Sequence, residues 1–158
     1  MLKTKRLIAT LLILFLLSAC TEADEAEPEQ GTWAGDEPTD YAEFVEALEG
    51  QGVSVESLGG DEPSLFEEAS VQSIVIDEEQ IEDAQIHVFS FPDAEARDAA
   101  AETITDRGLT VGGQPIDWPE QPYFWSLGNM IILYTEGDDD VIAYLTGILG
   151  VPINEIPG

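Results

Sequence analysis

A single cysteine and a single histidine are the residues best suited to nucleophilic or metal chemistry in this chain of 158 residues. Cys20 has no second cysteine for an internal disulfide, and one histidine cannot form a histidine-based metal cluster within one chain. His87 lies in the apolar run 84–91, a predicted strand, where alternation places it on one face with Phe89 and Phe91. We interpret it as a strand histidine with a polar or solvent contact, and a general base is the alternative.

The sequence patterns of common catalytic and phosphate-binding sites are missing. No Gly-x-Ser-x-Gly sequence occurs, which argues against a nucleophile elbow, and no lysine follows Cys20, which excludes a lysine-containing phosphate loop. The sequence therefore predicts no catalytic residue, no cofactor and no enzyme activity.

Two acidic runs could supply oxygen ligands to a hard cation such as calcium. "GDDDV" spans residues 137–141 and "DEEQIED" spans residues 77–83. Neither run has the alternate spacing and distal glutamate of an EF-hand loop. Acidic residues at a helix start also satisfy unpaired N–H groups and complement the helix dipole. We expect a helix cap and a solvated turn rather than a metal site, and calcium binding is the alternative.

Aromatic residues concentrate in the segment that follows a loop rich in proline and glycine. Strand alternation places Tyr123 and Trp125 on one face and Phe124 on the other. Core packing is the expected use of these rings. The alternative is a partly exposed binding patch for a partner, an apolar ligand or a sugar, formed by Trp118, Tyr123 and Trp125.

The start of the chain has the three parts of an export signal. Three basic residues precede the uncharged run 7–17, and two small residues come directly before Cys20. As a helix this run would rise about 16 Å, short of the roughly 30 Å core of a bilayer. The order Leu-Ser-Ala-Cys at residues 17–20 resembles the lipobox of bacterial lipoproteins. The resemblance implies that residues 1–19 are a signal peptide and that the Cys20 thiol carries the lipid anchor.

This resemblance implies an extracytoplasmic address. The protein would be held on the outer face of the plasma membrane or on the outer membrane, because two or three acyl chains make membrane binding lasting. The membrane, contacted through the Cys20 anchor, is then one partner, and an envelope protein is another.

The rest of the chain is strongly acidic. All 33 acidic residues follow Cys20, where Arg97 and Arg107 are the only basic residues, so the formal charge of this part is −31. Such a field repels nucleic acid and anionic lipid heads, which excludes nucleic acid as a partner. Adaptation to high salt or to an alkaline exterior explains the charge, and cation binding is the alternative.

Composition divides the chain after Cys20 into a tether and one domain. Residues 20–38 are acidic, contain proline and glycine, and have little apolar content besides Trp33, which predicts a disordered, extended tether. Residues 39–158 have regular patterning and suit a single domain.

The domain pattern predicts an α+β fold. We expect helices at residues 41–49, 94–104 and 141–149, strands at 53–58, 70–77 and 84–91, and a hairpin of 123–127 with 130–134 around Gly128 and Asn129. The order αβββαββα predicts an antiparallel sheet of about five strands with the helices packed on one face. The apolar spacing of "FVEALEGQGVSVE", "HVFSFPDAEARDAAAETI" and "NMIILYTEGDDDVIAYLTGILG" resembles a group of small bacterial lipoproteins. That resemblance, over residues 40–150, implies the fold and adds no chemistry.

These observations predict a lipid-anchored envelope protein that acts as a non-enzymatic binding or accessory module. A lipoprotein that binds a small ligand or a cation such as calcium is the alternative.

Overall fold

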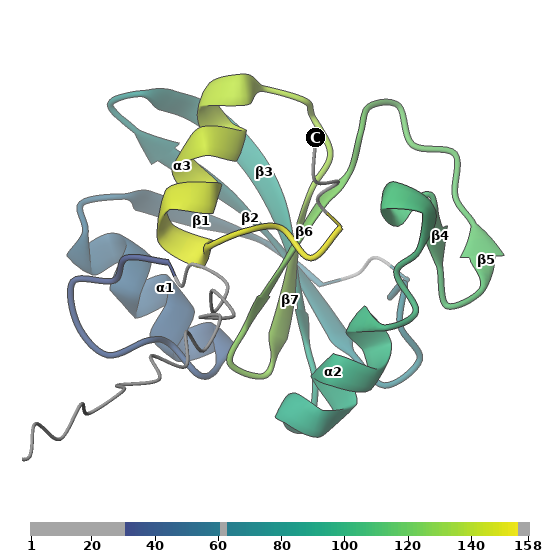
Figure 1. The fold of residues 1–158 in the computed structure, drawn as a ribbon. Helices are drawn as coiled ribbons and strands as arrows, with labels where there is room; N and C mark the ends of the chain where they lie inside the picture. The colour runs from purple at the N-terminus through teal and green to yellow at the C-terminus, as the bar shows by residue number, and fades with distance from the viewer. Residues whose placement is uncertain (1–30, 61–62, 155–158) are drawn as a thin grey trace, which may run out of the picture.

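A computed structural model describes residues 31–60 and 63–154 (Figure 1). The predicted signal peptide, Cys20 and the first part of the predicted tether lie outside these residues. Within the described part, no helix combines the length and the apolar character that a membrane crossing requires.

Five antiparallel strands form the main sheet, in the spatial order β1-β2-β3-β7-β6. Their bounds are β1 Ser54–Gly59, β2 Ser70–Glu78, β3 Ile81–Ser90, β6 Tyr123–Leu127 and β7 Met130–Tyr134. Two short strands, β4 (Thr110–Val111) and β5 (Gln114–Pro115), pair separately and follow the 3-10 turn η1 (Asp106–Gly108). The α+β class, the five-stranded antiparallel sheet and the order αβββαββα are confirmed, with β4 and β5 as an addition.

Three helices complete the fold: α1 (Tyr41–Gly50), α2 (Ala94–Ala101) and α3 (Asp139–Leu149). Each begins at an aspartate whose carboxylate accepts hydrogen bonds from the first-turn amides, namely Asp40, Asp93 and Asp138. A second carboxylate in the first turn of α1 bonds the residue before the cap. The Glu43 carboxylate accepts from the backbone N–H and the hydroxyl of Thr39, at 2.8 and 2.6 Å, and the hydroxyl bond is the main reason that the pKa of Glu43 is lowered.

The prediction that all helices cover one face of the sheet is wrong. Phe44 of α1 and Leu145 of α3 belong to a core on one face, together with Ile86 and Val88 of β3. Helix α2 lies on the other face, where its alanines pack beside Phe89 of the same strand (Figure 1). The physical reason is that the sheet is apolar on both sides: every residue of β7 is buried, as in strands covered on two faces.

Part of the predicted tether packs against the domain. Trp33 is half-buried and meets Phe44 edge-on, with ring centroids 6.0 Å apart. Thr39 receives a hydrogen bond from the Asn129 amide at the β6–β7 turn, and Thr32 donates one to the Gly147 carbonyl. Residues 31–38 therefore belong with the domain rather than with a disordered linker, because the Trp33 ring packs on the apolar surface around Phe44.

Candidate binding site

The three aromatic residues proposed as a patch are not brought together. Trp125 is fully buried in the core under α1 and α3, and Tyr123 stacks on it with centroids 6.0 Å apart. Trp118 lies on the opposite side of the sheet, edge-on to Phe124 at 6.2 Å, and its indole N–H donates to the Gly108 carbonyl at 2.8 Å. The shared face of Tyr123 and Trp125 was predicted, but Trp118 precedes β6 and packs on Phe124, which belongs to the core on the other face.

The His87 side chain contacts a side chain of the neighbouring strand β2. Its Nδ1 lies 2.8 Å from the hydroxyl of Ser73, which faces it across β2 and β3 and is 4% exposed. This contact fits the interpretation of a strand histidine with a polar partner.

The two acidic runs belong to a helix cap and to the region of the β2–β3 turn. The Asp138 carboxylate accepts hydrogen bonds from the amides of Asp140 and Val141, so it caps α3. Asp83 has a φ of 48° in the irregular stretch that follows the β2–β3 turn. Among residues 31–60 and 63–154, no group of three or more histidine, cysteine, aspartate or glutamate side chains is placed to hold a metal ion.

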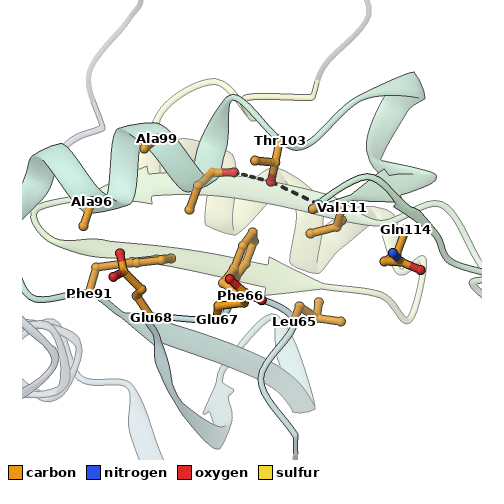
Figure 2. A pocket seen from close by; sticks show the side chains of 12 residues that line it. Leu65, Phe66, Glu67, Glu68, Phe91, Ala96, Ala99, Thr103, Val111 and Gln114 are labelled. Atoms are coloured by element: carbon orange, nitrogen blue, oxygen red, sulfur yellow. Dashed lines mark hydrogen bonds between the residues drawn. The ribbon is translucent and has the colours of Figure 1, made fainter.

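A hollow lies on the α2 side of the sheet (Figure 2). We call it the α2 groove; its volume is about 560 Å³, within the usual range for ligand sites. Its lining residues are Leu65, Phe66, Glu67, Glu68, Phe91, Ala96, Ala99, Ala100, Thr103, Val111, Gly112 and Gln114.

One wall of the α2 groove is helix α2, which presents only methyl groups there. Ala96 and Ala100 are half-buried and Ala99 is exposed, and no residue of α2 is fully buried. Alanine favours the helix strongly but reaches a short distance from its axis. The small side chains therefore leave space between α2 and the segment that faces it, as Figure 2 shows.

The facing wall is the segment 65–68, which one aromatic side chain holds in place. Phe66 is buried and meets two rings of the sheet edge-on, Phe89 at 5.1 Å and Phe91 at 5.6 Å. Its backbone N–H donates to the Ser64 hydroxyl, and its carbonyl accepts from the Ala69 amide. These contacts hold the backbone of this wall, which carries the exposed residues Glu67 and Glu68.

One end of the α2 groove is closed by the turn between β4 and β5. The Thr103 hydroxyl, just past the end of α2, donates to the Ala100 carbonyl at 2.6 Å and accepts from the Gly112 amide at 3.1 Å (Figure 2). Val111 is buried beside this link, and Gln114 lines the same end. The hydroxyl thus joins the end of α2 to the turn between β4 and β5.

A second hollow of about 230 Å³ adjoins the α2 groove, since Leu65 lines both. We call it the Trp118 hollow; it is lined by Pro63, Leu65, Val71, His87, Phe89, Trp118, Leu133 and Thr135. Its walls are mainly apolar and aromatic.

The sequence patterns did not single out the α2 groove. Its two walls are thirty residues apart in the chain and meet only in the folded sheet. Phe66, an isolated aromatic residue beside two glutamates, and the alanine face of α2 were the available signals. Comparison with protein-family models, with curated proteins and with solved structures gave no match, so function is argued from the site.

Proposed function

We propose that the protein is a lipid-anchored binding module of the bacterial envelope and that the α2 groove is its binding site. The observation that carries this proposal is a partly apolar groove whose two walls are each held by the protein's own contacts. Phe66 fixes one wall and the Thr103 hydroxyl fixes the other. Binding of a partner to a preformed site carries a smaller entropic cost, because fewer groups of the site have to become ordered.

The lining of the α2 groove supports binding rather than catalysis. Thr103, its one hydroxyl-bearing residue, already bonds a carbonyl and an amide. Glu67 and Glu68 are consecutive and both stand on the 65–68 wall. A pair of carboxylates that cleaves a glycosidic bond must instead flank that bond from two sides.

The anchoring half of the proposal rests on the lipobox-like residues 17–20. Cys20→Ser should leave the precursor uncleaved or release the protein from the membrane fraction, and cell fractionation with immunoblotting measures this. The matched control is Ser18→Ala, which keeps a small residue ahead of the cysteine and should be retained. Normal cleavage and retention of Cys20→Ser would contradict the anchor.

The binding half can be tested by filling the α2 groove. Ala99 is an exposed residue of the groove wall, so Ala99→Trp should block the groove without disturbing the core. Ala42→Trp is the control, because Ala42 is an exposed residue of α1 on the opposite face of the sheet. Envelope partners crosslinked to the full-length protein in cells should be lost in the first variant and kept in the second. Equal crosslinking of both variants would contradict the site.

The Trp118 hollow favours a second candidate function, the binding of a small aromatic ligand. Its volume of about 230 Å³ exceeds the roughly 150 Å³ of an apolar cavity that holds benzene. Benzyl alcohol should change the tryptophan fluorescence of the full-length protein and leave that of Trp118→Phe unchanged. A similar change in both proteins would contradict this candidate.

A further inference from the structure

We infer that the α2 groove takes a peptide segment of a partner protein in which an apolar side chain stands next to a lysine or an arginine. This inference rests on the proposed function, because it names the partner chemistry of the same site. It combines the shape of the groove with the charge of its 65–68 wall.

The apolar requirement comes from the inner surface of the groove. Phe66, Phe91 and Val111 are buried residues that line it, and α2 faces them with alanine methyl groups. From Ala96 to Thr103 the helix and its last turn advance about 10 Å at ~1.5 Å per residue. An extended peptide advances ~3.3 Å per residue, so about three residues fit along this wall. One apolar side chain of such a segment would enter between the two walls.

The cationic requirement comes from Glu67 and Glu68. Both are exposed and line the groove, so a lysine or arginine beside the apolar side chain can reach them. Arg97 on α2 does not neutralise them, because its Nε pairs with Asp98 at 2.8 Å. Opposite charges across an interface speed association and select partners.

The overall charge of the protein narrows the choice of occupant. A second copy of the part after Cys20 would bring a further formal charge of −31 to the groove, and the protein's own acidic tether would also bring negative charge. Nucleic acid and anionic lipid are repelled for the same reason. A basic, partly apolar peptide is the occupant that both the field and the groove lining attract.

The test is a selection from a random heptapeptide library on the full-length protein purified in detergent, followed by counter-selection on Ala99→Trp. We expect the peptides that need an open groove to carry a lysine or arginine next to an aromatic or aliphatic residue. Groove-dependent peptides without basic residues would overturn this inference and leave the proposed function standing. No difference between the two proteins would overturn both.

The affinity of a selected peptide then tests the role of the two carboxylates. Glu67→Gln/Glu68→Gln should weaken binding about fivefold at moderate salt, as expected for two exposed ion pairs, and the loss should shrink in concentrated salt. Glu46→Gln/Glu49→Gln is the control, since it removes the same charge from exposed positions of α1 across the sheet. Equal weakening by both variants would overturn the contact and leave only a general field effect.

Discussion

The turn between β6 and β7 gives the sharpest quantitative prediction, because it holds the segment through which the N-terminal part enters the domain. Gly128 has a φ of +52°, and a β-carbon added there would lie 2.3 Å from the carbonyl oxygen of Thr39. The next residue, Asn129, donates its amide to that same oxygen at 2.9 Å. Gly128→Ala therefore has to strain the turn and move the Thr39 backbone.

The expected cost has two parts. A left-handed conformation costs a residue other than glycine about 1–2 kcal/mol. Moving Thr39 to relieve the clash weakens a hydrogen bond worth about 1 kcal/mol and disturbs the packing around it. We expect Gly128→Ala to lower the free energy of unfolding by about 3 kcal/mol, measured by urea denaturation with circular dichroism.

Gly112→Ala is the matched control for the turn. Gly112 also has a positive φ, of 59°, but nothing lies within 4 Å of an added β-carbon. This variant should show only the conformational part of the cost, about 1–2 kcal/mol. If the two variants lose the same free energy of unfolding, the contact with Thr39 does not constrain the turn and the reasoning fails.

Three further predictions concern the groove, the charge and the half-buried phenol of Tyr144. Thr103→Val should lower the free energy of unfolding by about 1 kcal/mol and speed hydrogen exchange at the Gly112 amide, because the link from α2 to the β4–β5 turn is lost; unchanged exchange would contradict that link. Sodium chloride should raise the melting temperature by screening the acidic surface, and calcium chloride of equal ionic strength should raise it equally; a larger rise with calcium chloride than with sodium chloride would instead support a calcium site. Burial raises the pKa of Tyr144 above its ordinary value of 10.0, so the neutral phenol is favoured in the folded state and stability falls as pH rises past about 10. Tyr144→Phe should therefore lose less stability than the parent protein between about pH 9 and pH 11, measured by urea midpoints, and equal losses would contradict the shift.

Local sequence patterns were sufficient to predict the elements. The acidic cap of α3, the helices α1 and α3, and the Gly128-Asn129 turn depend on residues a few positions apart, and each was found where expected. Period-two alternation likewise placed Tyr123 and Trp125 on one face of β6. The lipobox-like start of the chain also rests on adjacent residues, and it stays a prediction because Cys20 lies outside the described residues.

The amino-acid sequence by itself determined the order of the three helices and of the five strands of the main sheet, and the face to which the residues of β6 point, because backbone periodicity is a local property. Only the tertiary structure decided which face of the sheet each helix covers, since an apolar helix can pack on either side of a sheet that is apolar on both. That choice placed α2 opposite α1 and α3 and set the alanines of α2 against the segment that Phe66 fixes. The α2 groove exists because of this long-range arrangement, in which residues thirty positions apart form its two walls.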